Sequence, residues 1–147
     1  MKISTKGRYG LRAFIDLAMH EEGTPVSINS ISLRQNISER YLEQLMAKLK
    51  KAGLVKSVRG ATGGYVLTKS PSEVSVGDVL RALEGGLEPV ACVSCSSEET
   101  CENEYTCAAK YVWQKINESI TNTVDGITIQ TLVEKSIDLV RKESKDE

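Results

Sequence analysis

The sequence predicts a mainly α-helical protein, in which a winged helix-turn-helix domain with a β-hairpin wing precedes a long dimerisation helix. Three observations predict this class. Apolar residues recur with helical spacing in three short segments of residues 1–53. A glycine-rich loop, RGATGG, then joins two runs rich in β-branched and aromatic residues, as in a hairpin. After residue 107 a further apolar stripe extends over residues 109–124, long enough to need a partner helix.

Three helices are expected before the hairpin. Ser4 or Thr5 can cap the first, which should run to about Glu21, while Ser27 and Ser38 can cap the second and third. The inward positions of these helices are Leu11, Phe14, Ile15 and Ala18, then Ile28, Ile31 and Leu33, then Leu42, Leu45, Met46 and Leu49. The lone histidine, His20, is interpreted as a residue at the end of the first helix rather than as a ligand.

The hairpin should pair Leu54–Val58 with Tyr65–Thr68. Ser75 and Asp78 then fit the capping box of a fourth helix. Two helices are expected at the carboxyl end, separated by Asp125 and Gly126. Their apolar stripes are Ala109, Val112, Trp113, Ile116, Ile120 and Val124, with Trp113 in a dimer core, and Ile129, Leu132, Val133, Ile137 and Val140. The final RKESKDE is expected to fray. The organisation predicted is a DNA-binding domain over 1–85, a cysteine loop over 86–107, helices over 108–142 and a tail over 143–147.

Charge is distributed unevenly along the 147 residues. Residues 1–70 carry twelve Lys and Arg against five Asp and Glu, a net +7, whereas residues 71–147 carry seven against fifteen, a net −8. A basic half suits a polyanion, most commonly nucleic acid, although a solvated surface can produce the same bias. No apolar run approaches the roughly 18 residues that span a bilayer, and no signal peptide is recognisable. We therefore expect a cytoplasmic protein without a membrane segment. With one histidine, no Ser/His/Asp set and no phosphate loop, an enzyme is not expected.

The third helix should enter the major groove of DNA, because the second helix of a helix-turn-helix has that role. Arg40 can donate two hydrogen bonds to guanine and Gln44 can pair with adenine, whereas Glu43 can only accept, which suits the cytosine amino group. Arg59, at the glycine-rich tip, can enter a minor groove. Glu43 can also be part of a solvated helix face, and Arg59 an ordinary turn residue. The predicted DNA-binding residues are Ser38, Arg40, Tyr41, Glu43, Gln44, Arg59 and Gly60.

All four cysteines lie in one stretch, ACVSCSSEETCENEYTC, over residues 91–107. Thiols in a reducing compartment bind metals or act in redox chemistry more often than they form structural disulfides. Four readings remain open: an iron–sulfur cluster on Cys92, Cys95, Cys101 and Cys107, a structural zinc site, a thiol redox switch, or cysteines without a ligand. The acidic residues of the loop should lower the reduction potential of a cluster.

Three segments resemble the IscR-like iron–sulfur cluster regulators: the opening MKISTKGRYGLRA, the segment ISERYLEQLMAKLKKAGLVKSVRGATGGYVL, and the cysteine loop followed by VW. The resemblance covers roughly residues 1–140. It implies a winged-helix regulator that binds palindromic operators as a homodimer. It also implies a [2Fe–2S] cluster, loaded by the iron–sulfur assembly machinery, that changes site preference and controls cluster-biogenesis genes.

The resemblance assigns the discriminating glutamate to Glu43, the minor-groove arginine to Arg59 and cluster binding to three cysteines. Two departures stand out. Lys110 occupies the position of the ligating histidine, three residues after the last cysteine, and one cysteine is additional. The expected ligands are Cys92, Cys101 and Cys107, with Cys95 spare or replacing the histidine. Alternatives are a nitric-oxide or redox sensor with the same fold, or a zinc or thiol redox protein that does not bind DNA.

Overall fold

The computed structural model describes residues 2–93 and 101–146. It confirms the mainly helical class with a single antiparallel hairpin in these residues. In chain order the elements are α1 (Thr5–His20), α2 (Ile28–Gln35), α3 (Glu39–Lys51), β1 (Val55–Val58), β2 (Gly64–Leu67), the 3-10 turn η1 (Pro71–Glu73), α4 (Val76–Glu84), the 3-10 turn η2 (Ala91–Val93), α5 (Ala109–Asp125) and α6 (Ile129–Lys145). No helix in the described ranges has the length and apolar character that crossing a bilayer requires.

Side-chain caps start three of the helices where the sequence predicts them. Ser27, Ser38 and Ser75 each accept a hydrogen bond from a backbone N–H in the first turn of α2, α3 and α4. The start of α1 is different, because Ser4 has no side-chain cap contact within its own helix. Glu84, at the end of α4, accepts the N–H groups of Ser4 and Gly7 at 3.0 and 3.1 Å. A carboxylate from α4 thus caps α1 and joins the two helices.

The hydrophobic core lies where α1, α3 and α4 meet, and Phe14, Leu17, Met46 and Val79 are fully buried in it. The first two turns of α6 also belong to this core, since Ile129 is 0% exposed and Val133 9% exposed. His20 ends α1, as expected.

Three of the residues predicted to face inward are exposed. Leu33 is 76% exposed, because α2 is short and buries only Ile31. Ile137 and Val140 are 39% and 57% exposed, because α6 leaves the body of the protein after its first turns. The tail predicted to fray is helical as far as Lys145. Helical periodicity was read correctly here, but it does not reveal whether another element covers the apolar stripe.

The hairpin is fixed to the body at its base. Val55 pairs with Leu67 and Val58 with Gly64, so residues 59–63 form the tip. Val26, just before α2, exchanges backbone hydrogen bonds of 3.0 and 2.9 Å with Tyr65. A Cβ atom at Gly64 would collide with the Val26 carbonyl, so glycine permits this close approach.

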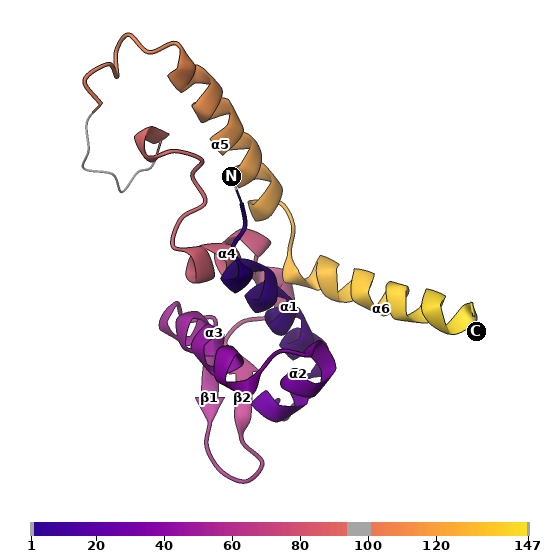
Figure 1. Ribbon diagram of the computed structural model, residues 1–147. Helices are drawn as coiled ribbons and strands as arrows, with labels where there is room; N and C mark the ends of the chain where they lie inside the picture. The colour runs from indigo at the N-terminus through magenta and orange to yellow at the C-terminus, as the bar shows by residue number, and fades with distance from the viewer. Residues whose placement is uncertain (1, 94–100, 147) are drawn as a thin grey trace.

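Figure 1 shows that the molecule is extended. The helix-turn-helix body and the hairpin lie at one end, α5 rises from the opposite side of the body, and residues 101–107 lead into the far end of α5. Helix α6 projects sideways from the corner where α5 ends. The two regions predicted to carry function therefore lie at opposite ends of the molecule.

Candidate functional site

The exposed face of α3 carries the polar side chains predicted to read bases. The stripe Leu42, Leu45, Met46 and Leu49 is buried with at most 1% exposure, which turns Arg40, Glu43 and Gln44 to solvent. Within the described residues no hydrogen bond or ion pair involves these three side chains. Ser38 accepts the N–H of Tyr41 at 3.2 Å and so fixes the start of the helix. Unpaired donors and acceptors on one helix face are what base-edge recognition requires.

Tyr41 lies beside α1 rather than among these exposed side chains. It is half-buried, its ring meets that of Tyr9 edge to face at 6.2 Å, and its hydroxyl lies 3.4 Å from the Thr5 hydroxyl. The guanidinium groups of Arg8 and Arg12 lie over the other ring of this pair, that of Tyr9. Tyr41 thus connects the start of α3 to a cationic stretch of α1.

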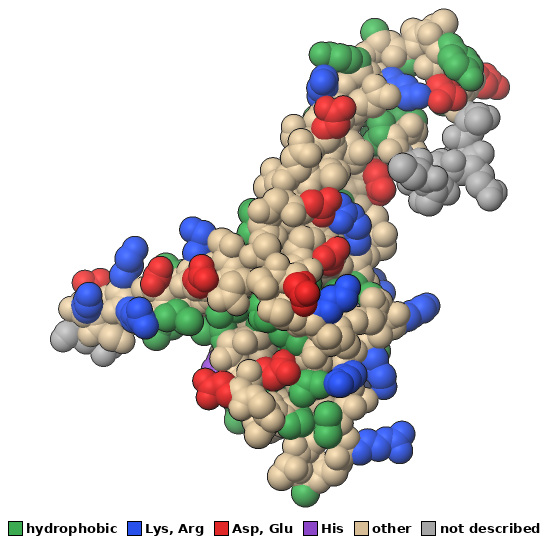
Figure 2. All heavy atoms as spheres, turned by 180° about the vertical axis from the view of Figure 1, so that it is seen from behind, with side chains coloured by type: hydrophobic (Ala, Val, Ile, Leu, Met, Phe, Trp, Pro, Cys, Tyr) green, Lys and Arg blue, Asp and Glu red, His purple; other side chains and the backbone are tan. Residues whose placement is uncertain are grey.

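Arg59 and Gly60 lie at the exposed tip of the hairpin. Gly60 has φ 117°, a conformation that side chains rarely adopt, and a Cβ atom at Gly63 would collide with the Val58 carbonyl. The tip is therefore a tight turn with one long cationic side chain. The hairpin is joined to α3 because Lys50 donates to the Ser57 hydroxyl at 3.0 Å. In Figure 2 Lys and Arg side chains follow the edge of the body on the side where α3 and the hairpin lie.

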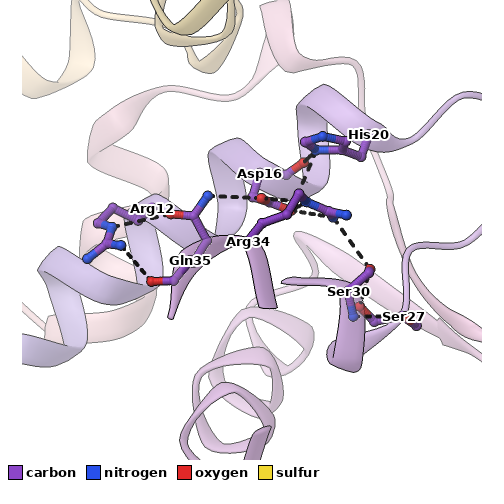
Figure 3. A network of polar contacts seen from close by, with 7 residues as sticks. All are labelled: Arg12, Asp16, His20, Ser27, Ser30, Arg34 and Gln35. Atoms are coloured by element: carbon purple, nitrogen blue, oxygen red, sulfur yellow. Dashed lines mark hydrogen bonds and ion pairs between the residues drawn. The ribbon is translucent and has the colours of Figure 1, made fainter. Parts of the chain in front are cut away.

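A polar network, shown in Figure 3, holds α2 against α1. Its centre is Asp16, only 2% exposed, whose carboxylate accepts hydrogen bonds from Arg34 at 2.7–3.2 Å and from Gln35 at 2.9 Å. Arg12 donates to the Gln35 carbonyl at 2.8 Å, and His20 donates from Nδ1 to the Asp16 carbonyl at 2.8 Å. The hydrogen bond with Asp16 raises the pKa of Arg34, so the guanidinium stays charged.

This network was not anticipated from the sequence. Its members are polar residues on two neighbouring helices. The only hint in the sequence is the position of Asp16 in the helical repeat of α1, which places it on the inward face. The network links α1 to α2, the first helix of the helix-turn-helix, and α3 follows that helix after a short turn.

The described cysteines gather near the amino-terminal end of α5. Cys92 lies in η2, which packs against α5, while Cys101 and Cys107 lie in consecutive turns that lead into this helix. All three are exposed and unpaired. Cys95 lies in residues 94–100, outside the described ranges. The described residues alone do not contain three metal-ligating side chains placed around one point. The donor set itself, thiols without disulfide partners, is the one that iron–sulfur clusters use.

Lys110, at the position implied for a histidine ligand, is engaged elsewhere. Its ammonium donates to the Glu104 carboxylate at 2.9 Å, and its side chain is 21% exposed. This hydrogen bond raises the pKa of Lys110, with smaller contributions from Cys92 and Tyr105. A protonated amine has no lone pair for a metal, so Lys110 does not supply the fourth ligand in this arrangement.

Comparison with known proteins gives one family, and the relatives include regulators named CymR and regulators named IscR. Residues 3–135 match the Rrf2 model, described as an iron-dependent transcriptional regulator. The HTH-type transcriptional regulator CymR of Bacillus subtilis is 47% identical over 133 residues, which are 90% of this chain and 89% of the relative. The HTH-type transcriptional regulator IscR of Aliivibrio salmonicida is 42% identical over 133 residues, 90% of this chain and 77% of the relative.

Solved structures of both CymR and IscR resemble this chain. The structure of CymR, the global cysteine regulator of B. subtilis, superposes with a TM-score of 0.77 at 43% identity, covering 92% of this chain and 98% of the other. IscR of T. potens gives a TM-score of 0.72 at 43% identity, covering 92% and 88%. The oxidized form of Staphylococcus aureus CymR gives 0.71 at 42%, covering 91% and 97%. The winged-helix fold is thus shared with CymR and with IscR.

Proposed function

This chain belongs to the Rrf2 family of DNA-binding transcription regulators, and from that premise we propose that it senses iron–sulfur status through a [2Fe–2S] cluster held by its cysteine loop. The observation that carries the proposal is the position of the thiols. Three unpaired, exposed cysteines lie near one end of α5, and the other end of this helix is joined to the DNA-binding body. A metal centre there can influence the body through a single rigid element. Family membership argues against a redox protein without a role in DNA binding.

DNA recognition would proceed through α3 and the hairpin tip. Ser38 holds the start of α3, Arg40 and Gln44 offer donors to base edges, and Glu43 offers only an acceptor. Arg59 would enter the neighbouring minor groove, with Gly60 allowing close approach of the backbone. Tyr41 would act mainly by positioning α3 on α1. The basic edge would supply phosphate contacts and hence a strong dependence on salt concentration.

The dimer is proposed to form through α5. In the described part of the chain no residue of this helix is buried, although it carries a continuous apolar stripe. Tyr111 and Val112 are 65% and 48% exposed, and Trp113 and Ile116 are half-buried. A second α5 packed antiparallel would cover this stripe and place two recognition helices on a palindromic operator.

Cluster binding is assigned to Cys92, Cys101 and Cys107, with Cys95 as the fourth donor because Lys110 is paired with Glu104. When bound, the cluster would supply a centre whose presence depends on iron and sulfide supply. The chain's own part is to offer thiolates near α5 and to hold the turns between Cys101 and Cys107, where Glu104 donates its N–H to the Cys101 carbonyl at 3.0 Å. The iron–sulfur assembly machinery is the donor that such a site implies, and cluster-biogenesis genes are the implied targets.

Anaerobic purification tests this function. The wild type should be coloured, with iron and sulfide in a one-to-one ratio, and its preferred DNA sites should change when the cluster is removed. Cys92→Ala, Cys101→Ala and Cys107→Ala should each be colourless, whereas Thr106→Ala, a polar change in the same loop, should retain the cluster. A wild type that stays colourless and iron-free, with an unchanged footprint on DNA, would exclude the proposal.

A second candidate is a thiol-based regulator without a cluster. Two observations favour it. Lys110 is paired with Glu104 and so supplies no metal ligand at the position implied for a histidine. The fold also resembles that of an oxidized form of CymR. Two thiols of the loop would form a disulfide, releasing two protons and passing two electrons to an oxidant such as a peroxide. Iron-free protein would then lose two hydrogen masses on treatment with hydrogen peroxide, and its DNA affinity would change until a dithiol restored it. Iron-dependent colour together with unaltered DNA binding on oxidation would exclude this candidate.

A further inference from the structure

One side-chain pair joins the DNA-binding body to the last residue of α5. Arg81, on α4, donates from Nη1 to Asp125 Oδ1 at 2.7 Å and from Nη2 to Oδ2 at 2.9 Å. Two parallel hydrogen bonds fix the orientation of the guanidinium and carboxylate planes as well as their separation. The contact raises the pKa of Arg81 and holds that of Asp125 below its ordinary value, so both groups remain charged near neutral pH.

The pair lies directly on the first turn of α4. Gly77 is buried beneath it, and a Cβ atom there would collide with the Asp125 carboxylate and lie 2.8 Å from Arg81 Nη1. Glycine is therefore the residue that lets the ion pair approach the helix backbone. The pair is about 40% exposed on each side, so its strength comes from its bidentate geometry rather than from burial.

The backbone just beyond Asp125 is fixed independently. Val76 donates its N–H to the Ile127 carbonyl and Ile129 donates to the Val74 carbonyl, both at 2.9 Å, and Ile129 is fully buried. The corner between α5 and α6 is thus held on the body. No residue of α5 is fully buried among those described, and Val124, in its last turn, packs against the hydrophobic core beside this corner. The 3-10 turn η2 contacts α5 further along. Contacts at the corner therefore hold the end from which α5 leaves the body.

The length of α5 amplifies small changes at this corner. Its 17 residues rise about 25 Å, so a tilt of about 5° displaces the far end by about 2 Å. Two subunits joined through α5 would double the change in separation between their recognition helices to about 4 Å, comparable with the roughly 3.4 Å rise of one base pair. Helix-turn-helix dimers bind half-sites at a fixed spacing. A change in the angle at the corner should therefore change the half-site spacing that the dimer binds best.

We propose that the Arg81–Asp125 pair, seated on Gly77, determines the spacing between operator half-sites by fixing the angle between α5 and the DNA-binding body. The inference rests on the dimeric, DNA-binding function proposed above. In this role Arg81, Asp125 and Gly77 are positioning residues that do not touch DNA.

The test compares duplexes that carry two inverted half-sites selected by the wild type, with the spacer changed by one or two base pairs in either direction. The variants are Asp125→Asn, Arg81→Gln and Gly77→Ala. The control is Glu118→Gln, which removes a carboxylate from the same helix, in an exposed pair with Lys115 at 3.5 Å. We expect the preference for the best spacing over its neighbours to fall about two- to fivefold in the variants, the range that an exposed ion pair permits, and to stay unchanged in the control.

Sedimentation and circular dichroism establish that each variant is a folded dimer. If Gly77→Ala does not fold, the two substitutions at the half-exposed pair decide the outcome. If all folded variants keep the spacing preference of the wild type, the inference is overturned and the proposed function is left intact. The same conclusion follows if the variants lose affinity equally at every spacing. A wild type that binds no duplex, or binds without preference, would instead overturn the proposed function and this inference with it.

Discussion

Glu43 stands between two potential donors on the exposed face of α3, and it is the residue whose loss should change specificity more than affinity. A carboxylate can only accept hydrogen bonds, so it favours bases that present an amino group and penalises the others. We predict that Glu43→Ala lowers the cost of a mismatch at the contacted base pair, normally about 1–3 kcal/mol, while affinity for the best site changes less than about threefold. Titration of a panel of single-base operator variants measures both quantities.

Lys48→Ala provides the control for Glu43, because it alters an exposed charge on the same helix without changing the acceptor. It should weaken binding about equally across the panel and reduce its salt dependence. A Glu43→Ala protein that loses affinity uniformly, like this control, would show that Glu43 belongs to a merely solvated face.

Arg59 tests the role of the hairpin tip. Because the tip is exposed and the arginine has no partner among the described residues, its removal should leave the fold unchanged. We predict that Arg59→Ala costs about 1–3 kcal/mol of binding to the operator and much less on unrelated duplexes. Lys69→Ala, exposed beyond the end of the hairpin, is a matched control. Equal operator affinity for wild type and Arg59→Ala would exclude the wing from recognition.

At the scale of single residues, the sequence predicted the placement of side chains whose orientation depends only on their own helix or turn. Helical spacing was enough to turn Arg40, Glu43 and Gln44 outward, and the glycines around Arg59 were enough to place it at a turn. Pairs that depend on the tertiary fold were not predictable, because Asp16 meets Arg34, and Arg81 meets Asp125, only after separate helices have packed. The Lys110–Glu104 pair was likewise out of reach, although the substitution at position 110 was visible.

At the scale of elements, the α1–α2 contact depends on a buried charge. Arg34 is 33% exposed but supplies most of the donors to the Asp16 carboxylate, whose side chain is 1% exposed. We predict that Arg34→Ala lowers the free energy of unfolding by about 2–3 kcal/mol, because it leaves a buried carboxylate with Gln35 as its main donor; breaking a fully buried pair would cost more. Urea denaturation at pH 7 measures this loss.

The control for this network is Arg12→Ala. Arg12 is exposed and contacts only Gln35 within the network, so its loss should cost less than about 1 kcal/mol. The double variant with Asp16→Asn should recover part of the stability lost in Arg34→Ala, because an amide is cheaper to bury than a charge. If Arg34→Ala is as stable as Arg12→Ala, the network does not hold α2 in place.

The beginnings of elements were easier to predict from the sequence than their surroundings. Ser27, Ser38 and Ser75 cap helices as expected, since a cap is satisfied by residues three positions away. Leu33, Ile137 and Val140 were placed on apolar faces that no other described element covers. The missing information was the direction in which α6 leaves the body, which is fixed by contacts between residues 74–76 and 127–129.

Across the whole molecule, the dimer is the feature that would connect the cysteine loop with DNA. The apolar stripe of α5 includes Trp113, the only tryptophan of the chain, so its fluorescence reports directly on this surface. Ile116 lies one turn away on the same stripe and is half-buried in the single subunit. A charge at Ile116 would be desolvated in an interface and hydrated in a monomer.

We predict that Ile116→Glu is monomeric in sedimentation equilibrium and that its Trp113 emission shifts to longer wavelength. Operator affinity should fall about 100-fold or more, because two linked half-site contacts become independent events, whereas affinity for a single half-site should hardly change. Gln114→Glu adds the same charge at an exposed position of α5 that lies off the stripe, and should remain dimeric. A dimeric Ile116→Glu with unshifted emission would place the subunit contact elsewhere, and α5 could then not connect the cysteine loop of one subunit to a pair of recognition helices.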